Sequence, residues 1–162
     1  MVCCSKALTW TVPSKGSDEP LRSLGIDFGE KRIGMAVSDP TNTIATPLDT
    51  LRRRAGKRPP ITRMAEIGRQ FDVGHVVVGL PLGLDGEENA WCAEVREVGR
   101  KLGERLETEV FFVDERMTSV RAERAVRSLG LSKRAREEKD RIDAAAAQLI
   151  LQAWLDHPEI AR

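Results

Sequence analysis

The chain has 162 residues, 41% of them hydrophobic and 31% charged, which is typical of one soluble globular domain. Its 26 basic and 25 acidic side chains give a net charge of +1, which taken alone disfavours a strongly basic nucleic-acid binder. Four Phe, three Trp and no Tyr argue against a single-strand binder that stacks bases on aromatic rings. Three cysteines without metal-ligand spacing indicate a reducing compartment, and no segment is apolar enough to span a membrane. We therefore expect a cytoplasmic protein without membrane contact.

The hydrophobic pattern predicts a flexible N-terminal extension at 1–20 and a single domain at 21–162. In chain order the predicted elements are strands at 24–29, 32–38 and 43–51, a helix at 61–71, a strand at 75–80, a helix at 87–106, a strand at 110–113, a helix that starts at Thr118 or Ser119 and ends at Gly130, a charged connector at 131–139, and a helix at 140–155.

The order of these elements predicts an α/β fold. A hairpin-rich start followed by alternating strands and helices indicates a mixed five-stranded sheet flanked by helices. The apolar run at 75–80 is typical of a buried parallel strand. In such sheets the site lies at the carboxyl ends of the parallel strands. Trp91 and Trp154 fall on apolar helical stripes and are expected in the core.

Three acidic residues stand where this sheet would bring them together. Asp27 interrupts an apolar strand, Glu115 follows the strand at 110–113, and Asp143 shares a helical stripe with Ala147 and Ile150. Converging carboxylates repel one another, and a divalent cation is the simplest compensation. Oxygen ligands without Cys or His favour Mg²⁺ or Mn²⁺, and two such ions can activate water and stabilise the leaving oxygen of a phosphodiester.

Each acid also has an ordinary structural explanation. Asp27 would accept hydrogen bonds from the turn at Gly29, and Glu115 would pair with Arg116. Asp143 would lie in the first turn of the last helix, where the helix dipole favours an acid, with Asp140 as its N-cap.

Four segments of the chain, in the same order, resemble the motifs of the YqgF/RuvX family. They are Gly25-Ile26-Asp27-Phe28-Gly29-x-Lys31-Arg32-Ile33-Gly34-x-Ala36-Val37-Ser38-Asp39, Val78-Gly79-Leu80-Pro81-Leu82-x-x-Asp85-Gly86, Asp114-Glu115-Arg116-Met117-Thr118-Ser119 and Asp140-x-x-Asp143-Ala144-Ala145-Ala146-Ala147. The resemblance covers about residues 22–156. The third motif usually ends in Thr, and Ser119 keeps its hydroxyl.

The resemblance implies an RNase H-like fold and a metal-dependent nuclease. Members of the family are described as Holliday-junction resolvases or as nucleases that mature the 5′ end of 16S ribosomal RNA. By motif, Asp27, Glu115 and Asp143 would be the catalytic acids and the ligands of Mg²⁺ or Mn²⁺, with Asp114 as an alternative second acid. The sequence does not choose between RNA and branched DNA or between endo- and exonuclease, and junction resolution would require a homodimer.

Basic residues near these motifs are candidates for binding the substrate. Lys31, Arg32, Arg116 and Thr118 are expected to contact the phosphates around the scissile bond, while Gly79, Pro81 and Gly86 would shape the backbone near the site. Between Arg52 and Arg69 seven basic residues face one acid, and between Glu115 and Arg141 nine face five. Both stretches would hold phosphates in a salt-dependent manner unless they are simply solvated surface.

Two other classes of function remain open from the residues. An actin-like ATP-binding domain also has a phosphate loop after a first strand, but that fold normally needs two such domains. A non-catalytic nucleic-acid-binding module in translation or transcription would gain nothing from converging carboxylates. Stabilisation by ATP would identify the first class. Binding in EDTA, without cleavage under any metal, would identify the second.

Overall fold

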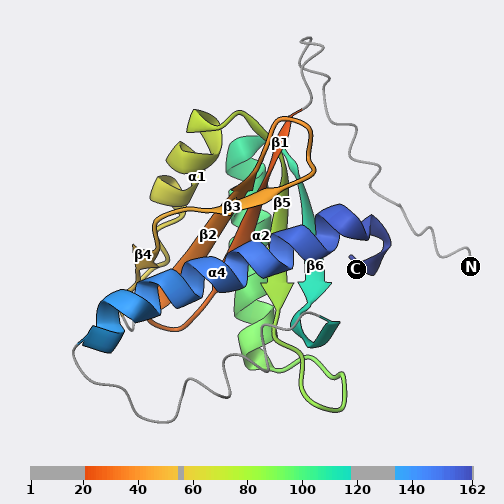
Figure 1. Cartoon of the computed structure of the whole chain (residues 1–162). Helices are drawn as coiled ribbons and strands as arrows, with labels where there is room; N and C mark the ends of the chain where they lie inside the picture. The colour runs from red at the N-terminus through yellow and green to blue at the C-terminus, as the bar shows by residue number, and fades with distance from the viewer. Residues whose placement is uncertain (1–20, 55–56, 118–133, 162) are drawn as a thin grey trace, which may run out of the picture.

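The computed structural model describes residues 21–54, 57–117 and 134–161. Its elements are β1 (Arg22–Phe28), β2 (Arg32–Ser38), β3 (Ala45–Pro47), β4 (Leu51–Arg52), α1 (Ile61–Gln70), β5 (Val73–Leu80), α2 (Ala90–Leu106), β6 (Glu109–Asp114) and α4 (Arg134–Asp156), with short 3₁₀ turns at Glu115–Met117 and Pro158–Ile160. The sheet order is β3–β2–β1–β5–β6, and β4 pairs with β2 beside this path (Figure 1). This is the expected mixed sheet, with the short β4 as an additional strand.

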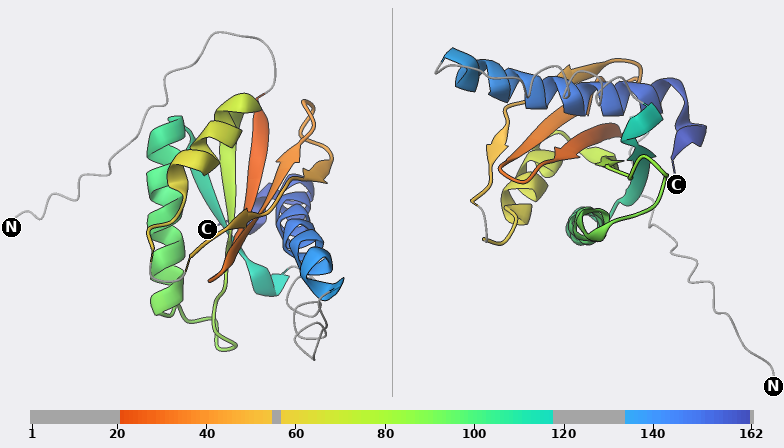
Figure 2. Two further views of the ribbon diagram at one scale, coloured as in Figure 1. Left: turned by 90° about the vertical axis from the view of Figure 1, so that its left-hand side faces the viewer. Right: turned by 90° about the horizontal axis from the view of Figure 1, so that it is seen from below.

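Helices cover both faces of the sheet. Seen from below, α4 crosses one face while α1 and α2 lie on the other (Figure 2). β1 runs antiparallel to β2 and parallel to β5, and β5 runs parallel to β6. The carboxyl ends of β1, β5 and β6 therefore meet at one edge of the sheet, as the sequence predicts.

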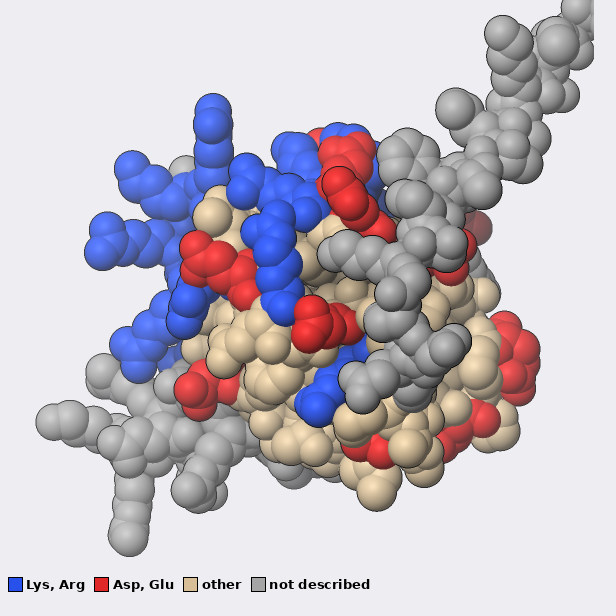
Figure 3. Space-filling model, turned by 90° about the horizontal axis from the view of Figure 1, so that it is seen from above, with Lys and Arg blue, Asp and Glu red and all other residues tan. Residues whose placement is uncertain are grey.

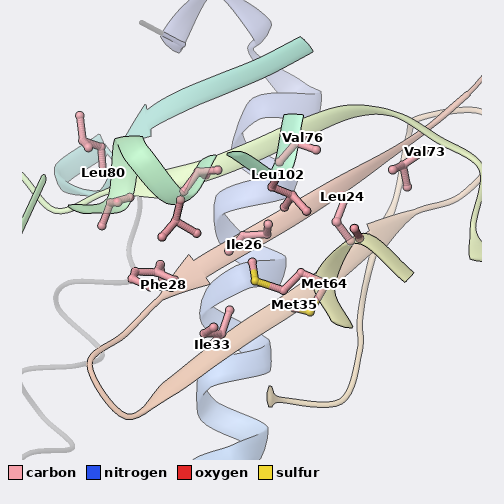
Figure 4. Close-up of a cluster of buried hydrophobic side chains, with 14 of the residues drawn as sticks. Leu24, Ile26, Phe28, Ile33, Met35, Met64, Val73, Val76, Leu80 and Leu102 are labelled. Carbon is pink, nitrogen blue, oxygen red and sulfur yellow. The ribbon is translucent and has the colours of Figure 1, made fainter. Parts of the chain in front are cut away.

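Strand alternation divides the core into two clusters. Leu24, Ile26 and Phe28 of β1 point toward α1 and α2, where they pack with side chains such as Met64 and Leu102 (Figure 4). On the opposite face Ala36 and Val77 pack with Ala147, Ile150 and Trp154 of α4. β5 contributes to both clusters, which explains its continuous apolar sequence. Trp154 is in the core as expected, whereas Trp91 is only half-buried.

The structure differs from the predicted elements at two places. The single strand expected at 43–51 is divided into β3 and β4, because Pro47 has no N–H to extend the ladder. Helix α4 begins at Arg134 rather than at residue 140, since the charged residues before Asp140 are good helix formers. Asp140 is thus not an N-cap and Asp143 is not in the first turn, so the helix dipole does not account for either acid.

The remaining helices agree with the sequence. α1 follows Pro59 and Pro60 as predicted, and α2 begins after Asn89, whose side chain accepts a hydrogen bond from the backbone N–H of Cys92 at 3.0 Å. The helix expected after Thr118 and the extension at 1–20 lie outside the described residues. None of the helices in the described ranges combines the length and apolar character needed to cross a bilayer.

The closest approach of α4 to the sheet gives a first prediction. A Cβ atom on Gly34 would lie 2.0 Å from the backbone oxygen of Asp143, and neither backbone can move freely inside the fold. Gly34→Ala should therefore lower the free energy of unfolding by about 1–3 kcal/mol, measured by urea denaturation.

Gly83→Ala is the matched control, because the nearest atom to its new Cβ belongs to the rotatable carboxylate of the exposed Asp85. Equal stability of the two variants would contradict the close contact between β2 and α4.

Candidate functional site

Asp27 lies on the face of the sheet that α4 covers. Its neighbours Ile26 and Phe28 point to the opposite cluster, so strand alternation turns Asp27 toward α4. Its cross-strand partner on β2 is Gly34. On β5 the partner of Ile26 is Val78, which brings the next residue, Gly79, level with Asp27. Two strand positions without side chains therefore flank this aspartate.

The space above these glycines is occupied by the other two acidic residues. The backbone of Asp143 covers Gly34, and a Cβ on Gly79 would lie 2.8 Å from Oε1 of Glu115. Glu115 follows β6 directly, and β6 lies beside β5. The structure thus brings Asp27, Glu115 and Asp143 to one face of the sheet at one edge. The sequence placed Gly79 near the site, but it did not show that these glycines make room for the backbone of Asp143 and the carboxylate of Glu115.

The three acids differ in exposure. Asp27 is 3% and Glu115 5% exposed, whereas the Asp143 side chain is 23% exposed and its Oδ2 lies 3.9 Å from Nη1 of Arg32. Burying carboxylates this deeply is unfavourable unless cations or hydrogen-bond donors compensate. Oxygen donors of this kind match the preference of Mg²⁺ and Mn²⁺, so the donor chemistry fits a divalent ion. Within the described ranges, however, no three Asp, Glu, His or Cys side chains form a group ready to hold a metal.

Asp114 has a different environment from Glu115. Its carboxylate accepts hydrogen bonds from the Arg116 side chain, at 3.0 Å from Nε to Oδ2 and 2.7 Å from Nη2 to Oδ2, and one from the Arg116 backbone N–H at 2.9 Å. The Asp114 carboxylate raises the pKa of the Arg116 guanidinium. Nη1 of Arg116 also lies 3.4 Å from the backbone oxygen of Leu84. Asp114 and Arg116 therefore connect the end of β6 to the loop after β5.

A hollow of about 390 Å³ lies beside Asp27. Its lining includes the β1–β2 turn from Asp27 to Arg32, together with Pro81, Trp91 and Asp143. Lys31 and Arg32 are thus next to the acids, where they could contact a phosphate group. Trp91, which the sequence assigned to the core, is one wall of this hollow.

Arg53 packs against two aromatic residues that line the hollow. Its guanidinium carbon lies 4.8 Å from the ring centre of Phe28 and 5.4 Å from that of Trp91, and it forms a salt bridge with Glu94. Its backbone N–H donates to the carbonyl of Lys31 at 2.9 Å. The sequence showed Arg53 only as one of several basic residues, because nothing local indicates a contact with Trp91.

Thr118 and the helix expected after it lie outside the described residues, and so do the side chains of 134–142. The contribution of Thr118 and of the second basic stretch to the site therefore stays a prediction.

Solved structures share the fold of this chain. A Thermus thermophilus RuvC structure, in complex with Holliday junction substrate, aligns with a TM-score of 0.51 and 15% identity over 88% of this chain and 98% of that one. A fowlpox virus resolvase bound to Holliday junction DNA aligns with a TM-score of 0.52 and 9% identity over 86% and 99% of the two chains. At these identities the likeness concerns the fold alone.

Sequence relatives match the chain over most of its length. A protein from Roseiflexus sp. (strain RS-1) named "Putative pre-16S rRNA nuclease" is 39% identical over 86% of this chain and 97% of its own. A protein of the same name from Nocardia farcinica is 43% identical over 90% and 81% of the two chains. The sequence profile named RuvX and described as "Holliday junction resolvase" matches residues 21–157. The chain therefore belongs to the RuvX family.

Proposed function

We propose that this protein is a divalent-metal-dependent nuclease that hydrolyses phosphodiester bonds in structured nucleic acid, with precursor 16S ribosomal RNA as its substrate. The observation that carries the proposal is the placement of Asp27, Glu115 and Asp143 on one face of the sheet, over the glycines of β2 and β5. The names of the two relatives, at 39% and 43% identity, favour precursor rRNA.

Asp27, Glu115 and Asp143 would hold Mg²⁺ or Mn²⁺ through their carboxylate oxygens. When bound, such an ion polarises the phosphoryl group and lowers the pKa of a water molecule. In the structure the Asp143 carboxylate lies 3.9 Å from the Arg32 guanidinium, which compensates part of its charge.

The other side chains at the site bind and orient the substrate. Lys31 is exposed at the mouth of the hollow, and Arg32 lines it. Both would hold the non-bridging oxygens of the phosphate in the hollow. Arg116 stays bonded to Asp114 and fixes the backbone on both sides of Glu115, so that the Glu115 carboxylate keeps its place over Gly79.

Branched DNA is the second candidate substrate. The description of the family profile favours it. Resolving a four-way junction requires two symmetric cuts and hence a homodimer. Parallel assays on precursor rRNA and on a DNA junction, with mapping of the products, distinguish the substrates and show whether cleavage is internal or terminal.

Removing the charge of Asp27 should abolish cleavage. Asp27→Asn keeps the size of the side chain but weakens its interaction with a cation, so we expect at least about a 100-fold loss of cleavage rate with Mg²⁺ or Mn²⁺. Asp49→Asn makes the same chemical change at an exposed position and should cut at the wild-type rate. Cleavage by Asp27→Asn as fast as that by Asp49→Asn would refute the role of Asp27.

A second pair of variants separates the two adjacent acids. Glu115→Gln should lose cleavage, because Glu115 is proposed to bind the ion. Asp114→Asn should lower the melting temperature, since the buried acceptor of the Arg116 hydrogen bonds loses its charge. Melting curves and cleavage rates of both variants test this assignment. The reverse pattern, with cleavage lost only in a stable Asp114→Asn protein, would make Asp114 the second acid.

A further inference from the structure

Exposed basic side chains gather on the side of the molecule that carries α1. Seen from above, Lys and Arg are concentrated on that side (Figure 3). β4 and α1 lie on this side together, next to α2 (Figure 2). We define the basic track as the exposed basic residues of β4, of the loop after it and of α1, together with one residue of α2. Its members are Arg52, Arg54, Lys57, Arg58, Arg63, Arg69 and Arg105.

The basic track begins at the carboxylate site. Arg52 of β4 is the partner of Arg32 in the sheet, and Arg32 lies 3.9 Å from Asp143. The track ends near the opposite edge, because Arg69 comes just before the amino end of β5 and Arg105 just before that of β6. The eight residues of β5, at about 3.3 Å each, place these two ends roughly 25 Å apart.

Two arginines at the far end each donate a hydrogen bond to a neutral group of the neighbouring helix. Nη2 of Arg69 donates to the backbone oxygen of Arg105 at 2.7 Å, and Nη1 of Arg105 donates to Oγ1 of Thr62 at 2.8 Å. No salt bridge joins either guanidinium to a carboxylate of the described ranges. Neutral acceptors on the neighbouring helix thus orient both guanidinium groups.

Basic residues in the preceding turn of α2 form salt bridges instead. Arg100 pairs with Glu97 at 2.9 Å and also with Glu104, while Lys101 pairs with Glu97 at 3.0 Å. These cations lower the pKa of Glu97 to about 2. Arg100 and Lys101 are therefore neutralised within α2, whereas Arg105, which reaches Thr62 of α1, forms no salt bridge with the described residues.

We propose that the basic track binds the phosphate backbone of the substrate arm that leaves the carboxylate site, with Arg69 and Arg105 as its distal clamp. Phosphate oxygens would supply charged acceptors to the two guanidinium groups, which neutral partners already orient. The proposal rests on the proposed function in that the ligand is a nucleic acid. At 3.4 Å per base pair of B-form DNA, a DNA arm of about seven base pairs spans the track, and an RNA arm, with its shorter rise, needs a few more.

Binding to arms of different length tests the clamp. Fluorescence anisotropy in EDTA measures the affinity of the wild-type protein for RNA and DNA hairpins with stems of about 4 and about 12 base pairs, at salt from about 50 to 200 mM. The double variant Arg69→Gln/Arg105→Gln should bind the long stem roughly tenfold more weakly at low salt, and its slope of log affinity against log salt should be smaller by about 2. Its affinity for the short stem should not change. Arg100→Gln is the matched control and should bind like the wild type.

The outcomes separate this proposal from that of the nuclease. Wild-type affinity and salt slope in the double variant, equal losses on both stems, or no binding of either stem by the wild-type protein would overturn the clamp. Length-dependent binding by a protein that cleaves nothing under any metal would support the clamp and refute the nuclease. A preference of the clamp for the RNA or the DNA stem shows which arm it fits.

Discussion

Helix α4 lies so close to β2 that the backbone oxygen of Asp143 occupies the place where a side chain at Gly34 would begin. The rest of the site depends on this contact. Gly34 is the cross-strand partner of Asp27, so the contact fixes a residue of the last helix beside a residue of the first strand. Gly79 plays the same part on the other side of Asp27, where it leaves room for Glu115. Two positions without side chains thus allow the backbone of Asp143 and the side chain of Glu115 to approach the sheet on either side of Asp27.

The basic residues around this edge occupy two kinds of position. Arg116 is bonded to Asp114 and Arg53 to Glu94, and both support the walls of the site. Lys31 and Arg32 line the hollow itself. The net charge of +1 therefore conceals an uneven distribution, in which basic side chains line the hollow beside others that are bonded to carboxylates. A net charge near zero therefore does not disfavour a nucleic-acid substrate for a protein with such a distribution.

The sequence was sufficient to predict the mixed sheet and the edge at which Asp27, Glu115 and Asp143 meet. Alternation in β1 already separates Asp27 from Ile26 and Phe28, and the apolar run of β5 identifies the central parallel strand. It was insufficient for contacts between distant segments. Nothing near Gly34 indicates that a residue more than a hundred positions later will cover it. The start of α4 was also misplaced, because charged residues that favour a helix look like a connector when no apolar stripe accompanies them.

The central claim is that Asp27, Glu115 and Asp143 share a divalent ion at this edge of the sheet. Crystals of the protein soaked in Mn²⁺ and measured at the manganese absorption edge test it most directly, because anomalous scattering locates the ion independently of the carboxylates. We expect a peak within coordination distance of the Asp27 carboxylate and of at least one of the other two acids, and no peak in crystals of Asp27→Asn. A peak held by Asp114 without Asp27, or equal peaks in the wild type and in Asp27→Asn, would contradict the account.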